Sequence, residues 1–405
     1  MNSFVALVAV LGGLLVVGAL VSGLAQRTVL SLTALFVLAG FLFGKAALHV
    51  VSFDAASPLV TDLATIALIV ILFRDGLEVD WETLQSHWHV PLRNLIVAMP
   101  ITAAIIALLA RAFIGLSWTE SFLLGALLSP TDPVLSAGVV TDPRVPRVIR
   151  HSLNLESGLN DGLALPAVLA FAAALAPTDQ HFAWGRFVVQ DIGLGVVFGL
   201  ACGFVGSVLM PRAGREPGEL TIPGHQRAIY GLGLAFLTYG LAVLPPHGNG
   251  FIAVFVAAIV VGARRSDLRA EFARHTELLV EVLKFAVFVV FGALLTVHGL
   301  FSSGWAGVAT VAGTLLVARP VAIWVALAGT GLGRAAKLFM AWFGPKGVAT
   351  IAFGLLVIGE PVAAEVKIFN VAALAVFISI LVHGATDTPG IRWIARHGSG
   401  REDDG

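Results

Sequence analysis

The chain has 405 residues, of which 58% are hydrophobic and only 12% are charged, and its mean hydropathy is +0.92. Soluble domains carry roughly 25% charged residues, so this sequence holds too few charges to cover a water-facing surface. The formal net charge of +0 argues against the basic face of a nucleic-acid-binding protein, and a single cysteine, Cys202, excludes a disulfide framework or a thiolate metal cluster. We therefore expect an all-α integral membrane protein that uses no cofactor.

Long apolar runs divide the chain into about thirteen predicted transmembrane helices. A helix needs about 20 apolar residues to cross the hydrocarbon core, and charges and turn residues separate one run from the next. The predicted spans cover residues 4–23, 28–46, 57–75, 90–112, 119–140, 149–175, 187–209, 226–243, 250–263, 276–298, 303–329, 335–358 and 367–385.

Basic residues between the spans indicate how the chain is oriented. The loops that follow odd-numbered spans, taken with the C-terminal tail, hold 18 of the 25 Lys and Arg residues, whereas loops after even-numbered spans hold 4. Short loops rich in Lys and Arg stay on the cytoplasmic side of a membrane. The distribution predicts a multi-pass protein of the cell (inner) membrane with its N-terminus outside, its C-terminus in the cytoplasm and a short tail over residues 396–405.

Two predicted spans contain helix-breaking residues near their centres. The fifth carries SPTDP at 129–133, and the twelfth carries GPKG at 344–347, so that Asp132 and Lys346 each lie at a break. Proline removes a backbone donor and clashes with the preceding turn. If the seventh span is a linker, both breaks fall in the fifth helix of a six-helix half, and the two halves have opposite topology. Paired interrupted helices in inverted repeats mark the central site of a transporter.

Charged side chains gather in the spans around these breaks. A charge at the bilayer centre costs at least about 2.5–3.5 kcal/mol, so such residues are expected to be functional. In the sixth span Ser157 and Asp161 are four residues apart and share one helix face. Hydroxyl and carboxylate oxygens suit a hard cation, and the break adds oxygens from Thr131 and Asp132. The intramembrane charges are those of Asp132, Glu156, Asp161, Arg319 and Lys346.

The sum of these five charges indicates a mechanism. It equals −1, so one Na⁺ or one proton would neutralise the site. Burial disfavours the ionised form of a carboxylate, so proton and cation can compete for Asp161 and Asp132. Competition for a site that crosses only when occupied predicts a secondary active antiporter with electroneutral 1:1 exchange of Na⁺ or Li⁺ for H⁺. Glu156 is expected either to contact the cation or, more readily, to form a structural ion pair with Lys346.

Two other groups of charges are interpreted as structural. Arg74 and Asp75, at the end of the third span, are expected to form an ion pair at the membrane surface with no role in transport. Glu281 and Lys284 are three residues apart in the tenth span and can pair on one helix face. Arg319 is expected either to balance charge at the site or to bind a backbone carbonyl.

At these residues the sequence resembles the monovalent cation:proton antiporters of the sodium/proton exchanger family, in its NhaP-like bacterial branch (cation:proton antiporter-1). The matching motifs are SPTDP at 129–133, ESGLNDG at 156–162, the Ala-Arg-Pro step at Arg319 and GPKG at 344–347. The resemblance implies the sodium/proton antiporter fold, with two inverted six-helix repeats and crossed broken helices, in a homodimer. It divides the chain into a mobile core (about 90–175 and 303–385), a dimerisation scaffold (about 1–75 and 226–298) and a linker helix at 187–209.

The resemblance also implies a role for each motif residue. Asp161 would be the main ion and proton carrier, with Asp132, Ser157 and Thr131 as further Na⁺ contacts. Asn160 would hold the fifth and sixth helices together, and an asparagine there is typical of the electroneutral branch. Glu156 would pair with the basic residue of the GPKG motif, which is usually arginine but is Lys346 here.

Three alternatives stay open from the sequence. A potassium/proton antiporter of the same fold would use the same oxygen ligands. A sodium-coupled organic-anion symporter would need donors for that anion, whereas Leu, Ala and Val dominate around the breaks. An intramembrane hydrolase would leave the inverted repeat unexplained, so we expect no enzyme. The expected partners are monovalent cations, protons, the lipid bilayer and a second copy of the chain.

Overall fold

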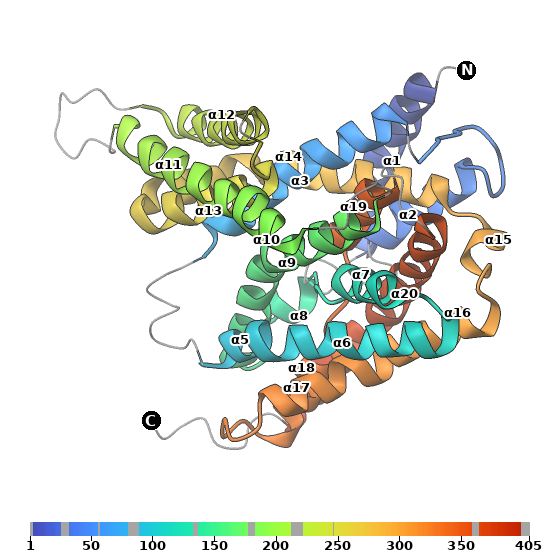
Figure 1. The fold of residues 1–405 in the computed structure, drawn as a ribbon. Helices are drawn as coiled ribbons and strands as arrows, with labels where there is room; N and C mark the ends of the chain where they lie inside the picture. Colours follow the sequence, from blue (N-terminus) through green and yellow to red (C-terminus); the bar gives the residue numbers. More distant parts are fainter. Residues whose placement is uncertain are drawn as a thin grey trace.

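The computed structural model describes residues 3–25, 32–55, 57–79, 89–132, 137–176, 183–211, 222–245, 247–358 and 364–397. Within these ranges every regular element is a helix, which confirms the all-α class (Figure 1). Pro133 of the first break, residues 398–405 of the predicted tail and three arginines counted for the orientation (Arg27, Arg212 and Arg215) lie outside the described ranges.

The helices follow the predicted spans along most of the chain. Their bounds, in chain order, are α1 Ser3–Ala25, α2 Leu32–Phe43, α3 Pro58–Leu77, α5 His89–Arg93, η1 Asn94–Ala98, α6 Met99–Leu109, η2 Ala110–Ile114, α7 Trp118–Leu128, α8 Ala137–Thr141, α9 Arg147–Leu175, α10 Trp184–Arg186, η4 Phe187–Gly193, α11 Leu194–Leu209, α12 Gly224–Val243, α13 Gly250–Arg264, α14 Ser266–Leu294, α15 Val297–Leu300, α16 Gly304–Gly313, η5 Thr314–Ala318, α17 Arg319–Ala326, α18 Arg334–Trp342, α19 Val348–Ile358 and α20 Glu365–His397. The elements labelled η are π-helical turns within longer helices.

The number of membrane crossings stays a prediction. Among the described residues, five helices are long and apolar enough to cross a membrane, namely those over residues 89–114, 147–175, 184–209, 304–326 and 365–397, and five further apolar stretches are shorter. Length and composition therefore support a multi-pass protein without fixing the count of thirteen or its orientation.

Two helices extend beyond the predicted limits because their ends are buried. α14 begins at Ser266 rather than near residue 276, and its first turns bury Leu268 and Phe272 on one face. α20 continues to His397 rather than ending near residue 385, although it contains a proline. Ile391 and Ile394 pack into a second hydrophobic cluster with α9, α17 and α18, so tertiary packing overrides the break that Pro389 would favour.

The helices form two groups with α7, α9 and α19 lying between them (Figure 1). On one side α11 packs against α13, α13 against α3, and α14 against α2. On the other side α6 packs against α7, η5 and α17. Close packing of α11 depends on glycine: a Cβ at Gly199 or Gly203 would overlap with the backbone of α13, as expected where small residues let membrane helices approach.

The two interrupted helices meet where each is unwound. α7 ends at Leu128 and α18 ends at Trp342, and neither 129–132 nor 343–347 is helical. The two extended segments bond to each other: Asp132 N–H donates to the carbonyl of Pro345 at 2.8 Å, and Val348 N–H donates to Asp132 Oδ2 at 3.2 Å. The predicted crossing of two broken helices is therefore present, and it buries Asp132 at the N-terminal end of α19.

The crossing allows no side chain at Gly347. A Cβ built there would overlap with the side chain of Asp132. We expect Gly347→Ala to lower the free energy of unfolding by about 1–3 kcal/mol, which is typical of overpacking. Thermal unfolding of the purified protein in detergent measures this.

The matched control is Gly354→Ala on the same α19, where the nearest atom, Phe369 Cδ2, is 3.5 Å from the added Cβ. This substitution is expected to be neutral or stabilising, since alanine favours a helix interior over glycine. Equal melting temperatures for the two variants would contradict the close crossing.

Candidate cation site at the crossing of the two interrupted helices

Helix α9 carries the polar residues of the site past the crossing. Glu156, Asn160 and Asp161 are 5%, 2% and 6% exposed. Their spacing places Glu156 and Asn160 on one stripe of the helix and Ser157 and Asp161 on the neighbouring one. The two stripes have different surroundings. As a result, the Glu156 carboxylate is held by hydrogen bonds, whereas the Asp161 carboxylate has an oxygen without a donor among the described residues.

Asn160 joins α9 to the unwound segment after α7. Its Nδ2 donates to the carbonyl of Thr131 at 2.7 Å and lies 3.1 Å from Thr131 Oγ1. This is the contact that the family resemblance implied for Asn160. Both oxygens of Thr131 are therefore engaged within the protein, which weakens the prediction that Thr131 is a cation ligand.

Glu156 is held by three donors rather than left open. Arg319 Nη1 donates to Glu156 Oε1 at 2.7 Å, Asn94 Nδ2 donates to Oε2 at 2.9 Å, and Thr131 Oγ1 donates to Oε1 at 3.3 Å. The Arg319–Glu156 ion pair is almost wholly buried. The prediction that Glu156 pairs with Lys346 is therefore wrong, because Arg319 on α17 reaches the carboxylate instead.

Lys346 and Arg319 each face the carbonyl end of an interrupted helix. Lys346 Nζ lies 3.2 Å from the carbonyl of Pro130, just after α7, and Arg319 Nε lies 3.3 Å from the carbonyl of Met340 in the last turn of α18. A helix C-terminus carries a partial negative charge and carbonyls without helical partners. The two cations therefore stabilise the two breaks.

Three residues that complete this network were not singled out from the sequence. Asn94, 1% exposed, is the amide donor to Glu156, and His383 on α20 places Nε2 2.9 Å from the carbonyl of Trp342 at the end of α18. Ser379, one turn before His383, accepts a bond from the backbone N–H of Lys346 at 2.9 Å. Their signal in the sequence was only that polar side chains occur within apolar spans.

Asp161 differs from Glu156 in having an oxygen without a donor. Its Oδ1 is buried and receives no hydrogen bond from any residue that the structure describes. Ser157, one turn earlier, likewise forms no hydrogen bond with the described residues. A buried carboxylate oxygen left without a donor is costly, and a cation or a proton would remove that cost. Asp161 is therefore the open position of the site.

The charges that act on Asp161 come from both groups of helices. They are those of Asp75 and Arg74 on α3, Asp132 at the crossing and Lys284 on α14. Asp75 is 4% exposed and forms an ion pair with Arg74 at 3.0 Å. The predicted pair is thus present, but its carboxylate is buried beside the site rather than lying at the surface.

The predicted pair between Glu281 and Lys284 is wrong. Glu281 is exposed, whereas Lys284 is 5% exposed. Lys284 lies on the same face of α14 as the buried Val280 and Phe288. Because this face is packed against the protein, the Lys284 side chain is buried as well. Its charge acts on Asp75 and Asp161, so Lys284 belongs to the surroundings of the site.

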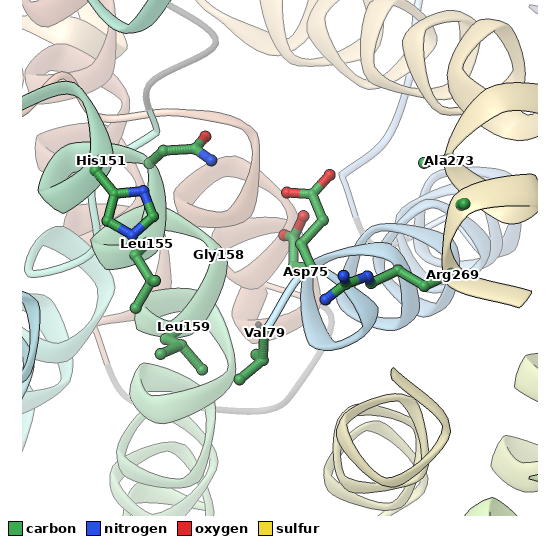
Figure 2. Close-up of a pocket in the computed structure, with 11 residues that line it drawn as sticks. Asp75, Val79, His151, Leu155, Gly158, Leu159, Arg269 and Ala273 are labelled. Atoms are coloured by element: carbon green, nitrogen blue, oxygen red, sulfur yellow. The ribbon is translucent and has the colours of Figure 1, made fainter. Parts of the chain in front are cut away.

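A cavity of about 420 Å³ leads toward these charges between α3, α9 and α14 (Figure 2). Asp75 and Glu78 line it from α3, His151 and Gly158 from α9, and Arg269 from α14. Figure 2 shows His151 and Arg269 on opposite sides of the space, with Asp75 between them. Because Asp75 lines the cavity and its charge acts on Asp161, we take the cavity as the solvent side of the site.

Comparison with known proteins places this geometry in a family. The family model described as "Sodium/hydrogen exchanger, transmembrane" matches residues 12–393. The chain belongs to the sodium/hydrogen exchanger family. The chain is 28% identical over 363 residues to the Na⁺/H⁺ antiporter NhaP of Pseudomonas aeruginosa, covering 82% of this chain and 81% of that one.

Other similar proteins are named as antiporters of potassium or of sodium. The chain is 24% identical over 384 residues to the K⁺/H⁺ antiporter NhaP2 of Shewanella baltica, and it spans 64% of the length of that protein. The sodium proton antiporter MjNhaP1 of Methanocaldococcus jannaschii has the same fold, with a TM-score of 0.78 at 19% identity over 98% of this chain and 97% of the other.

The Glu156–Arg319 pair predicts a specific energetic coupling. Removing one partner of a buried pair costs about 3–5 kcal/mol, so Glu156→Gln and Arg319→Gln should each strongly lower the melting temperature. The double variant should lose less free energy of unfolding than the sum of the two, by about 0.5–3 kcal/mol.

The same cycle between Glu156→Gln and Lys346→Gln is the matched control. A smaller coupling is expected there, because Lys346 contacts carbonyls rather than Glu156. Coupling that is larger with Lys346 than with Arg319 would contradict the observed pairing.

Proposed function

We propose that the protein is a secondary active antiporter that exchanges a monovalent cation, Na⁺ or Li⁺, for H⁺ at Asp161. The observation that carries the proposal is the buried Asp161 Oδ1, which has no hydrogen-bond donor among the described residues. It lies one helical turn from the Ser157 hydroxyl and beside the crossing. Membership of the exchanger family and the antiporter names of the relatives support the same activity.

Fewer residues are proposed to contact the cation than the sequence indicated. Asp161 and Ser157 offer an open carboxylate and hydroxyl on one helix face, and Asp132 adds a second carboxylate at the crossing. Thr131 and Glu156 are engaged by Asn160, Arg319 and each other, so we assign them to holding the site together.

The choice of Na⁺ over K⁺ is part of the proposal. Carboxylate and hydroxyl oxygens suit both ions, and the relatives are named for both. A potassium/proton antiporter built on the same site is therefore the second candidate. The symporter has less support, because the carboxylates of Asp75 and Glu78 line the cavity and would repel an organic anion.

Electroneutral exchange follows from the charges around Asp161. The five intramembrane charges counted from the sequence sum to −1. One bound cation or one proton then neutralises the site, so each exchange moves no net charge. Asn160 adds no second acidic group, since it binds Thr131 as a neutral amide.

We further propose that the protein works as a homodimer in the cell membrane, with a mobile core carrying the crossing and a scaffold carrying α3 and α14. Asp161 and Asp132 then belong to the core, while Asp75 and Lys284 belong to the scaffold. The arrangement of two helix groups around α7, α9 and α19 is compatible with this division (Figure 1).

Activity is tested in everted vesicles that carry a pH gradient reported by a quenched dye. Wild-type protein should dissipate the gradient when Na⁺ or Li⁺ is added, and Asp161→Asn should reduce the response to background for every cation, because the amide neither exchanges a proton nor carries charge. Asp62→Asn, an exposed carboxylate near the start of α3, is the control and should keep full activity.

The outcomes separate the candidates. A response to K⁺ alone would favour the potassium/proton antiporter. Full activity in Asp161→Asn, or no response to any cation in wild-type vesicles that contain the protein, would overturn the proposal.

A further inference from the structure

Helix α20 carries a row of polar side chains that bond to the broken end of α18. Ser379, His383 and Thr386 share one face of α20 by their spacing, within a mostly apolar stretch, and the first two are buried. Each of the three bonds to Trp342 or to Lys346. Polar groups inside a membrane helix are costly unless they have partners. Here the partners lie on the interrupted helix, so this face of α20 is built to hold it.

Ser379 and His383 form one hydrogen-bonded chain with the unwound segment. The backbone N–H of Lys346 donates to Ser379 Oγ at 2.9 Å, and Ser379 Oγ lies 3.1 Å from His383 Nδ1. His383 Nε2 lies 2.9 Å from the carbonyl of Trp342, which also accepts the N–H of Gly344. The chain therefore ties the unwound segment to α20 at two points.

The order of donors along this chain assigns the ring proton of His383. Ser379 Oγ accepts from the backbone, so its own hydrogen can donate to His383 Nδ1. Nδ1 also lies 2.9 Å from the carbonyl of Ser379, but that carbonyl has its donor within the helix. We therefore assign the proton to Nε2, which donates to the carbonyl of Trp342 at the end of α18.

The same unwound segment bonds to Asp132. The N–H of Asp132 donates to the carbonyl of Pro345 at 2.8 Å, and the N–H of Val348 donates to Asp132 Oδ2 at 3.2 Å. Lys346 lies between Pro345 and Val348 in the chain, and its N–H makes the bond to Ser379. A shift of the backbone at Lys346 would therefore move the groups that hold Asp132.

We propose that Ser379 and His383 are positioning residues that set the place of the Asp132 carboxylate in the cation site. The proposal rests on the proposed function, in which Asp132 contacts the cation. Both residues act through the backbone of the unwound segment rather than by touching the cation. Loss of either one lets the segment shift and weakens cation binding.

The test compares Ser379→Ala with wild-type protein, using the cation to which wild-type everted vesicles respond. The alanine leaves the N–H of Lys346 without its acceptor. The half-saturating cation concentration should rise about tenfold, the lower end of the loss when an outer partner of a metal ligand is removed. The maximal rate should fall by a smaller factor, because Asp161 is untouched. The rise in melting temperature that the cation causes in purified protein should show the same loss of affinity, with choline chloride as the ionic-strength control.

Thr386→Val is the matched control on the same face of α20. It removes the 2.9 Å bond from Trp342 Nε1 to Thr386 Oγ1, which involves a side chain rather than the backbone of the unwound segment. This variant should lower the melting temperature in the absence of cation and keep the wild-type half-saturating concentration. A merely structural role for Ser379 predicts the same behaviour for both variants. Equal half-saturating concentrations in Ser379→Ala and Thr386→Val would overturn the proposal.

A second pair of variants keeps the test decisive if Ser379→Ala does not fold. His383→Gln keeps an amide N–H at about the reach of Nε2 and should keep the wild-type affinity. His383→Leu removes the donor and should weaken cation binding. Equal affinities in these two variants would contradict the positioning role.

Failure of the proposed function looks different. Wild-type protein would then show neither cation binding nor dissipation of the pH gradient, which would overturn both proposals. Wild-type affinity in Asp132→Asn would overturn the positioning role alone, and exchange at Asp161 would stand.

Discussion

The site depends on the neutralisation of helix ends that are exposed inside the protein. Interrupting α7 and α18 leaves backbone carbonyls without helical partners where little water can reach them. Lys346 and Arg319 bring cations to these two ends, and His383 adds a further contact at the second. At the N-terminal end of α19, where the helix dipole is positive, Asp132 accepts a hydrogen bond from the N–H of Val348. The breaks can persist in a low-dielectric interior because each of these three described helix ends has an oppositely charged partner.

This arrangement gives two carboxylates on one helix opposite roles. Glu156 receives bonds from Arg319, Asn94 and Thr131 and serves as the centre of the supporting network. Asp161, five residues later, lies on the neighbouring stripe, where its Oδ1 receives none from the described residues. The same residue chemistry therefore supports the site in one case and leaves it open in the other, and the difference comes from which helices lie opposite each stripe.

The sequence was sufficient for features that depend on local pattern. Apolar runs predicted the helices, proline and glycine predicted both breaks, and spacing along α9 placed Ser157 and Asp161 on one face. Partners that come from distant parts of the chain were not predictable in this way. Arg319 and Glu156 are separated by 163 residues, and only the tertiary structure decides that Arg319, rather than Lys346, reaches the carboxylate.

The local sequence pattern also did not show which face of a helix is buried in the protein. Lys284 and Glu281 are close enough in sequence to pair, yet the face that contains Val280 and Phe288 is buried and takes Lys284 with it. Asp75 was assigned to the surface for a similar reason, because its position at the end of a span does not reveal that α9 and α14 close over it. Both residues carry charges from other helices that act on Asp161, so they change how the site is expected to bind ions.

The central claim is that a cation and a proton compete for Asp161. The most direct measurement is proton release when Na⁺ is added to purified protein in weakly buffered detergent solution, with bound Na⁺ counted in the same sample. The account predicts close to one proton released per cation bound at a pH where the empty site is protonated, and neither release nor binding in Asp161→Asn. Cation binding without proton release in wild-type protein, or unchanged release in Asp161→Asn, would contradict it.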